Sequence, residues 1–288
     1  MVPQYHLRHL CQALQVPRST YYAWRHPKAS PRQQQNQLLR AKLSELFLAH
    51  RQVYGSPRLT VCLNRQGLAC SRKRVARHMR ALGLQARQKR SFKPKTTDPH
   101  HPHPLAHNLL SATAKPQSPN RVWVSDITYI FTAQGWLYLA AVMDLYSRKI
   151  IGWSTADHLK TSLVQEAFLQ AVRSRRPKAG LLHHSDRGVQ YASTHYRQLL
   201  ASLKALPSMS SSGNCYDNAA IESFWSSLKT EWLHHKTFCS RSQASLAVFD
   251  YIETFYNPKR LHSALGYQSP VDFERRNSHA QTSKIPVH

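Results

Sequence analysis

Acidic side chains are scarce in this sequence. Among its 288 residues, 14 Asp and Glu stand against 40 Lys and Arg, and the formal net charge is +26. The shortage is most severe in residues 1–120, which carry 21 basic and 2 acidic side chains. Because each phosphate that a cation neutralises releases counterions, this charge balance favours a polyanionic partner. Nucleic acid is the leading interpretation, and a basic protein bound to ribosomes or acidic membranes is the alternative.

Paired cysteines and long apolar runs are also missing. The five cysteines, at positions 11, 62, 70, 215 and 239, form no C-x-x-C pair and no metal-ligand spacing, which argues against a disulfide framework and a zinc finger. No apolar run approaches the ~18 residues of a membrane span, and the first residues lack the apolar core of a signal peptide. We therefore expect a protein of a reducing cytoplasm, without a membrane partner.

The chain is long enough for two domains, and its 41% hydrophobic content is sufficient for a core. Residues 1–90 have the pattern of a helical region. Leu7, Leu10, Cys11 and Leu14 recur at helical spacing, and a Val-Pro step at 16–17 interrupts them. Ser19 is expected to cap a second helix, which gives a helix-turn-helix pattern.

A second helical unit follows, with clearer boundaries. Ser56 precedes a proline and is expected to cap one helix, while Ser71 caps another that carries an apolar stripe. The other faces of this second helix carry five cations: Arg72, Lys73, Arg74, Arg77 and Arg80. Five cations without an acid repel one another unless a polyanion compensates. We therefore predict that they contact DNA phosphates, with a solvated basic face as the alternative.

Residues 91–120 have the composition of a linker. Five prolines lie between Pro94 and Pro116. Four histidines, at 100, 101, 103 and 107, would suit a metal only on a fixed scaffold. The intervening prolines favour a polar linker instead.

Alternating β-branched and aromatic residues begin after residue 120. Runs at 122–131, 135–145 and 149–155 predict three antiparallel strands joined by short turns. Helices are expected at 162–173, 193–203 and 218–232, and strands at 180–184 and 206–209. This order predicts a mixed α/β fold with five strands over residues 121–275. A last helix at about 242–255 precedes a proline-punctuated tail, of which 276–288 form the end.

Three of the scarce acids occupy positions that need an explanation. Asp126 lies within the first predicted strand, Asp186 just past the fourth, and Glu222 on a late helix. Carboxylates that converge repel one another and raise one another's pKa, whereas Mg²⁺ or Mn²⁺ turns such a cluster into a binding site. Two such ions support phosphodiester chemistry. For any one acid alone, a turn-end or edge position is the alternative.

Other conspicuous residues are assigned structural roles. Asp144, on the adjacent strand, is a rival fourth carboxylate that we interpret as structural. Asp217 is expected to cap a helix and Glu231 to lie on the surface. Gly188 is expected to give the backbone room beside Asp186. Two tryptophans, Trp123 and Trp225, are predicted to be core residues rather than base-stacking platforms.

Five groups of residues carry a family resemblance. They are Tyr-Gly-Ser-Pro-Arg at 54–58, Trp-Val-Ser-Asp-Ile-Thr-Tyr at 123–129, His-Ser-Asp-Arg-Gly-Val-Gln-Tyr at 184–191, Gly-Asn-Cys-Tyr-Asp-Asn at 213–218, and Tyr-Asn-Pro at 256–258 with Leu-Gly at 265–266 and Ser-Pro at 269–270. Asp186 and Glu222 enclose 35 residues. The chain resembles the retroviral-integrase-like DDE transposases of bacterial insertion sequences, and most of all the second-frame product of the copy-out/paste-in group.

The resemblance implies an RNase H-like core of five strands with flanking helices, preceded by a helix-turn-helix region. It implies that Asp126, Asp186 and Glu222 are catalytic and bind two Mg²⁺ or Mn²⁺ ions. In that family one site performs two reactions: water frees a 3′-OH at the element's end, and that 3′-OH attacks another phosphodiester. The first joining forms a circle, and a later one inserts it into target DNA.

Two residues near Glu222 extend the expected site. Lys229 lies seven residues further on, which places it on nearly the same helix face about 10.5 Å away. Family members commonly carry Lys or Arg there, so the resemblance implies a DNA contact, against the alternative of an exposed lysine. Asn218, one turn before Glu222, is expected to orient metal-bound water or DNA, and capping of the helix is its competing role.

The resemblance also implies partners and alternatives. Terminal inverted repeats and target DNA are the expected substrates, held by a homo-oligomer on the bacterial nucleoid. Because the group often makes a fusion with an upstream frame that carries a helix-turn-helix and leucine zipper, such a protein is a further expected partner. A hydrolysis-only RNase H-fold nuclease or resolvase, and a DNA-binding repressor without activity, are the alternative functions.

Overall fold

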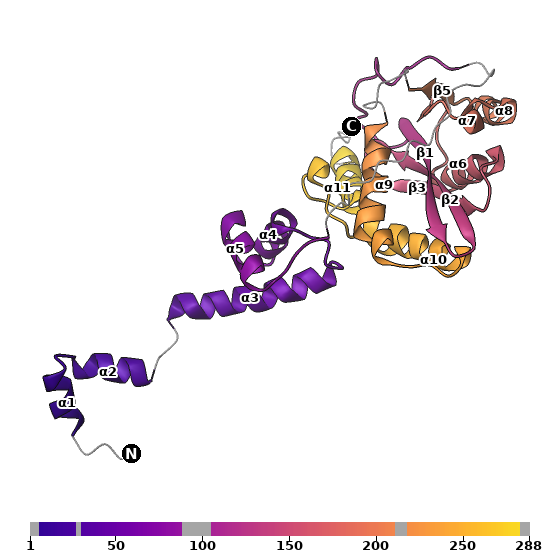
Figure 1. The fold of residues 1–288 in the computed structure, drawn as a ribbon. Coiled ribbons are helices and arrows are strands. Elements are labelled where there is room, and N and C mark those ends of the chain that lie inside the picture. The colour runs from indigo at the N-terminus through magenta and orange to yellow at the C-terminus, as the bar shows by residue number, and fades with distance from the viewer. Residues whose placement is uncertain (1–5, 27–29, 88–104, 211–217, 283–288) are drawn as a thin grey trace, which may run out of the picture. The chain divides into compact units, whose positions relative to one another are not determined.

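Helices alone form the first part of the chain, and a sheet with helices forms the second (Figure 1). The computed structural model describes residues 6–26, 30–87, 105–210 and 218–282, with side chains up to residue 278. The chain divides into two compact units, residues 1–86 and 87–288, each of which is described by itself. Among the described helices, none has the length and apolar character needed to cross a membrane.

The first unit contains α1 (Leu7–Ala13), α2 (Arg18–Arg25), α3 (Pro31–Ala49), α4 (Ser56–Arg65) and α5 (Arg72–Ala81). Helices α3, α4 and α5 pack together around fully buried apolar side chains: Leu43, Leu59, Leu63 and Val75. The sequence predicts four of these helices but not α3. Its start carries a capping box, in which Ser30 Oγ accepts from the Gln33 amide at 3.2 Å and the Ser30 amide donates to Gln33 Oε1 at 2.7 Å.

Predicted helix caps are right in one of three cases. Ser71 caps α5, because its Oγ accepts from the Arg74 amide at 3.3 Å. Ser19 does not cap α2, which begins one residue earlier because Pro17 already has the extended φ and ψ of a cap. Ser56 does not cap α4 either. Gly55 holds the extended cap position, so that Ser56 and Pro57 become the first helical residues.

The predicted five-stranded mixed sheet is confirmed in the second unit. Its strands are β1 (Val122–Thr132), β2 (Gly135–Asp144), β3 (Ile150–Ala156), β4 (Leu182–Ser185) and β5 (Leu206–Met209). Their order is β3-β2-β1-β4-β5. The first three are antiparallel neighbours, whereas β4 runs parallel to both β1 and β5. The meander and the parallel pairs together form the sheet that the sequence pattern predicts.

Helices cover both faces of this sheet (Figure 1). On one face lie α6 (Thr161–Arg175), α7 (Val189–Ala192) and α8 (Thr194–Ser202), around a core that includes Trp123, Phe168 and Tyr196. Helix α6 approaches so closely that a Cβ on Gly152 would lie 2.2 Å from the Ala167 carbonyl oxygen, so residue 152 of β3 has room only for glycine. Helices α9 (Ala219–Glu231) and α10 (Arg241–Tyr251) contact β1, and α10 also contacts β2.

The chain after α10 differs from the expected tail. The helix continues as a π-helical turn (Ile252–Tyr256), and α11 (Pro270–Thr282) follows where no helix is predicted. Ser269 initiates α11, since its Oγ accepts from the Asp272 amide at 3.2 Å. Phe273 of α11 packs on Tyr146 with ring centroids 5.1 Å apart. The described residues from 256 to 282 are therefore part of the second unit's fold.

The predicted linker falls partly outside the described residues. Its described part, residues 105–120, contains no helix or strand but lies along the core. The Leu109 amide donates to Ser208 Oγ at 2.9 Å, and the Asn120 amide donates to Asp144 Oδ2 at 2.6 Å. Of the four linker histidines, only His107 lies in the described part.

Candidate active site

Strand register places two of the three predicted acids side by side. Asp126 lies in the middle of β1, and Asp186 is the first residue after β4. These strands are parallel neighbours, with Ser125 paired to Ser185. Asp126 directly follows Ser125 in the sequence, and Asp186 directly follows Ser185. The fold therefore brings Asp126 and Asp186 to adjacent positions.

Asp126 is held by two hydrogen bonds in a poorly solvated position. Its Oδ1 accepts from the Ile127 amide at 2.8 Å, and its Oδ2 accepts from Trp225 Nε1 at 2.9 Å. Burial and then the charge of Asp186 raise the pKa of Asp126 to about 7, while the two hydrogen bonds oppose this and the charge of Glu222 adds to it. The Asp126 carboxylate is therefore a strong candidate for compensation by a cation.

Gly188 shapes the surroundings of Asp186 as predicted. Its amide donates to Asp186 Oδ1 at 3.0 Å. A Cβ at residue 188 would lie 3.0 Å from that same oxygen, closer than side chains normally pack. The backbone of Gly188 has an ordinary φ of −59°. Limited space beside Asp186, rather than a left-handed conformation, therefore favours glycine at this position.

Glu222 lies in the first turn of α9, the helix that crosses β1. Its side chain is exposed at the residue level, and partial burial of its carboxyl raises the pKa of that group. Its charge nevertheless acts on Asp126. Within the described residues, no three His, Cys, Asp or Glu side chains are arranged as a group able to hold a metal ion. Glu222 is thus within electrostatic range of Asp126, but among the described residues it does not form a metal-binding cluster with the aspartates.

Lys229 points back to the sheet. Its Nζ lies 4.9 Å from the centroid of the Tyr129 ring on β1, a cation–π contact. Burial lowers the pKa of Lys229, while the negative charge of Asp126 raises it. This residue is therefore not the freely exposed helix lysine of the alternative interpretation.

Asn218 precedes α9 at the cap position, but its side chain makes no capping hydrogen bond. The side chain is buried, and its Oδ1 has no hydrogen-bond partner among the described residues. Its backbone carbonyl accepts from the Glu222 amide at 3.1 Å. The structure therefore does not support the capping role, and it leaves a buried amide oxygen one turn from Glu222.

The five predicted DNA contacts lie on α5, in the first unit. Four of their side chains are exposed: Arg72, Lys73, Arg77 and Arg80. Arg74 is partly buried, and its Nη2 donates to Asn36 Oδ1 at 2.9 Å. These cations therefore lie on one accessible helix.

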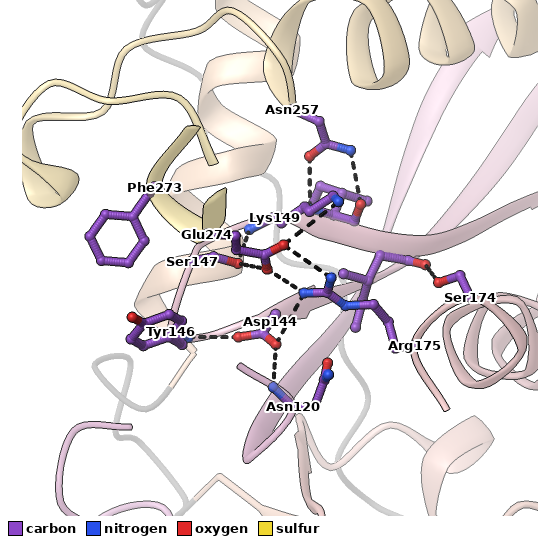
Figure 2. Close-up of polar contacts among 12 residues, drawn as sticks. Asn120, Asp144, Tyr146, Ser147, Lys149, Ser174, Arg175, Asn257, Phe273 and Glu274 are labelled. Carbon is purple, nitrogen blue, oxygen red and sulfur yellow. Dashed lines mark hydrogen bonds and ion pairs between the residues drawn. The ribbon is translucent and has the colours of Figure 1, made fainter. Parts of the chain in front are cut away.

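Asp144 is a buried structural residue, as the sequence predicts (Figure 2). Its side chain is fully buried and accepts from the Asn120 amide at 2.6 Å and the Tyr146 amide at 2.9 Å. Arg175 Nη2 lies 3.6 Å from its Oδ2. Since these partners already satisfy its oxygens, Asp144 is not a further ligand of the site.

The surface position predicted for Glu231 is wrong. Its side chain is 6% exposed and pairs with Arg260, whose Nε lies 2.7 Å from Glu231 Oε2. Tyr251 donates its hydroxyl to the same oxygen at 2.7 Å. Residues that follow α9 in the chain cover the end of that helix, so an acid there needs a buried partner. Asp217, predicted as a cap, lies outside the described residues.

Two residues lie close to the acids in a way that the sequence does not predict. Trp123 is a core residue as predicted, and Trp225 is buried too, but the Trp225 indole N–H also holds Asp126. Tyr191 is 2% exposed, and its hydroxyl has no hydrogen-bond partner among the described residues. Burial, then the charges of Tyr196, Asp126 and Asp186, raise its pKa well above the ordinary value. The motif at 184–191 contains Tyr191, but nothing in it reveals this position.

Family models match most of the chain. An integrase core domain matches residues 116–215, a second integrase core domain model matches 222–277, and an HTH-like domain matches 33–92. Solved structures with similar folds include a simian T-cell lymphotropic virus intasome (TM-score 0.47, 16% identity, 75% of this chain and 70% of that one). The HTLV-2 integrase catalytic core domain in complex with magnesium also matches (TM-score 0.43, 16% identity, 55% and 98%).

Curated relatives align along nearly their whole length. The insertion element IS600 31 kDa protein of Shigella sonnei is 42% identical over 93% of this chain and 98% of its own. The transposase for insertion sequence element IS904 of Lactococcus lactis is 41% identical over 88% and 100%. The transposase InsF for insertion sequence IS3A of Escherichia coli is 40% identical over 95% and 96%. The chain therefore belongs to the family of insertion-sequence transposases with an integrase core.

Proposed function

We propose that Asp126, Asp186 and Glu222 are the catalytic acids with which this polynucleotidyl transferase cleaves DNA and joins its strands. The observation that carries the proposal is the β1–β4 register, which sets Asp126 beside Asp186. The raised pKa of Asp126 supports it, because a carboxyl so placed by chance would weaken the fold without a compensating role. Glu222 completes the set from the opposing helix.

The donor chemistry of these acids fits Mg²⁺ or Mn²⁺. Such hard cations prefer carboxylate oxygens, and a positive charge would reverse the repulsion that raises the pKa of Asp126. We propose that Asp126 and Asp186 bind two ions and that the exposed Glu222 side chain turns toward them. The bound ions would assist attack by an oxygen nucleophile and departure of the leaving oxygen.

The chain's own residues orient the reaction. Trp225 and the Ile127 amide fix the Asp126 carboxylate, and the Gly188 amide fixes that of Asp186. Lys229 is proposed to bind a substrate phosphate, and Asn218 to orient water or DNA with its unpaired amide. Water attacks the phosphodiester at the element's end and a 3′-OH leaves. That 3′-OH then attacks a second phosphodiester in line and displaces the 3′-oxygen of the attacked strand, without a covalent protein intermediate.

Arginines and lysines of α5 are proposed to bind the DNA backbone: Arg72, Lys73, Arg74, Arg77 and Arg80. The exposure of four of them, all except Arg74, and the absence of any acid on the helix support this. We propose terminal inverted repeats and target DNA as substrates, bound by a homo-oligomer that holds both ends together on the nucleoid. A protein from an upstream frame remains a proposed partner.

A cleavage and joining assay tests the proposed acids. Purified protein is incubated with Mg²⁺ and duplexes cut from the DNA that flanks the coding sequence. We expect 3′-end cleavage and strand joining, and Asp126→Asn should abolish both while DNA binding persists. Asp157→Asn, at an exposed acid after β3, is the matched control and should retain activity.

The outcomes separate the competing functions. Cleavage without joining would indicate a hydrolysis-only nuclease. Binding without cleavage or joining would indicate a repressor. Activity that survives Asp126→Asn would refute the proposed catalytic role.

A further inference from the structure

A groove lies between α3 and α5, within the first unit. It has a volume of about 650 Å³. Helix α3 lines one side with Arg32, Gln35 and Asn36. The opposite side is formed by α5 and its cap, with Ser71, Lys73, Arg74, Arg77 and His78. The groove therefore lies between α5, which carries the predicted DNA contacts, and α3, a helix that the sequence does not predict.

The groove is strongly cationic. Four of its lining residues carry a positive charge, namely Arg32, Lys73, Arg74 and Arg77, and none is acidic. Glu45 is the only acid in residues 1–86, and it pairs with Lys42 at 2.8 Å, away from the groove. Like charges gathered in one concavity focus its potential and favour an anionic occupant. No other acid of this unit can neutralise the groove.

Hydrogen bonds hold the groove walls in place. Arg74 donates to Asn36 Oδ1 at 2.9 Å, which links α5 to α3 and fixes the orientation of the Asn36 amide. Arg40 Nε donates to His78 Nδ1 at 3.3 Å, a second link between the helices. Burial, then the charges of Arg40, Arg74 and Arg77, lower the pKa of His78. A neutral His78 is required for it to accept this bond, so the pKa direction and the geometry agree.

We infer that this groove is a two-helix DNA site, in which Arg32 of α3 and the α5 cations bind one backbone while Gln35 and Asn36 face the base edges. The inference rests on the proposed function of α5. The groove runs along α5 from its cap, Ser71, to His78, and α3 lies opposite. The side-chain amides of glutamine and asparagine are suited to base edges, whereas arginine and lysine are suited to phosphates.

Charge removal tests the backbone part of the inference. Full-length Asp126→Asn protein serves as the parent, and fluorescence anisotropy with labelled duplex DNA measures affinity over a range of salt concentrations. Arg32→Ala should weaken binding several-fold and reduce the salt slope by about 0.9, the contribution of one phosphate contact. Arg65→Ala removes an exposed arginine of α4 outside the groove and should change neither quantity. Equal effects of the two substitutions would show diffuse attraction and overturn the inference.

An uncharged substitution tests the base-edge part. Gln35→Ala preserves the net charge, so the salt slope should not change. Affinity for duplexes from the element's ends should fall several-fold, with little change for mixed-sequence DNA. Equal loss on both DNAs, or no loss on either, would overturn this part. Tighter binding of duplex RNA than of duplex DNA by the parent protein would also overturn it. Circular dichroism of each variant excludes unfolding as the cause.

The parent protein separates this inference from the proposed catalysis. Because Asp126→Asn is inactive by design, the binding measurements do not depend on cleavage. A failed cleavage assay with groove-dependent binding would count against the proposed acids alone. Cleavage by the active protein with binding that ignores Arg32 would count against the groove alone.

Discussion

The two units of this transposase treat charge in opposite ways. Residues 1–86 carry one acid, so the cations of α5 have no acidic side chain of their own unit to pair with beyond Glu45. The second unit buries acids and provides each with cations, as for Glu231 with Arg260 and Asp144 with Arg175. Asp126 is the exception, because it forms no ion pair with a described residue. In both units, the candidate functional surfaces are therefore marked by charged side chains that form no ion pair with a described residue of opposite charge.

Glu274 shows how the second unit uses a partly buried acid to hold α11 in place (Figure 2). It lies on α11 and accepts from Ser147 Oγ at 2.7 Å and from Arg175 Nη1 at 3.0 Å. Lys149 Nζ lies 3.7 Å away. Asn257 adds a second link, since its side chain bonds both the amide and the carbonyl of Ile150. The ends of β2 and β3 are thereby tied to segments far along the chain.

The largest expected effect comes from breaking the buried pair at the end of α9. Arg260→Ala removes the cation that pairs with the buried Glu231 carboxylate and should lower the free energy of unfolding by about 3–5 kcal/mol. Urea denaturation followed by circular dichroism measures this. Arg275→Ala removes the exposed pair with Asp272 and should cost about 0–1 kcal/mol. Similar losses for the two variants would contradict the contrast between buried and exposed charge.

A smaller effect, with a defined pH dependence, is expected from Glu274→Gln. Burial raises the pKa of Glu274, but Arg175, Ser147 and Lys149 outweigh it and hold the pKa below its ordinary 4.5. A depressed folded-state pKa contributes stability above the unfolded value, and that contribution is lost as pH falls through the folded value. Asp144 acts in the opposite direction, because burial raises its pKa.

Glu274→Gln should therefore cost about 2 kcal/mol at neutral pH and less in acid. Unfolding measured from pH 7 down to about pH 3 tests this, since that interval brackets the ordinary carboxyl pKa. Glu166→Gln, which alters an exposed pair with Arg173, is the control and should leave the curve unchanged. A constant difference between Glu274→Gln and the parent across this range would contradict the assignment.

Local patterns predict the parts of this molecule whose causes are local. Alternating residues indicate β1, β2 and β3. The parallel register of β1 and β4, which sets Asp126 in the middle of one strand beside Asp186 just past the end of the other, does not follow from a local pattern. Gly188 follows from its place beside an acid in a tight turn. The apolar residues of α3, such as Leu39, Leu43 and Leu46, do have helical spacing. The first half of α3 is polar, so the apolar pattern alone does not predict this helix. The capping box of Ser30 and Gln33 at its start is the sequence signal that would have predicted it.

Long-range partners leave no such signal. Glu231 has the sequence context of a surface acid, and only Arg260, 29 residues later, makes its burial tolerable. Trp225 is apolar in a helical pattern, so its bond to Asp126, 99 residues earlier, is not predictable from spacing. Helix α11 depends likewise on Arg175 and Ser147 from distant elements. These features require the tertiary structure because their stabilising contacts cross the chain.

Trp225→Phe should sharpen the distinction between Asp126 and the paired acids. The substitution removes one hydrogen bond to a carboxylate that has no ion pair, and we expect joining to slow about tenfold, equivalent to roughly 1.4 kcal/mol. Titration calorimetry with Mn²⁺ should show weaker binding. Trp153→Phe is a matched control, because the Trp153 indole also donates to a carboxylate, that of Glu253, at 3.0 Å. Loss of activity in both variants would attribute the effect to general destabilisation.

The smallest expected effect concerns a helix cap of the first unit. Ser71→Ala removes the side chain that accepts from the Arg74 amide and should lower the free energy of unfolding by about 1 kcal/mol. Ser19→Ala changes the same residue type inside the first turn of α2, where it caps nothing, and should stay within about 0.5 kcal/mol. Thermal unfolding of the two variants compares them directly. Equal losses would mean that the capping position of Ser71 contributes no specific stability. The repulsion among the cations of this unit would then have to be offset by other contacts.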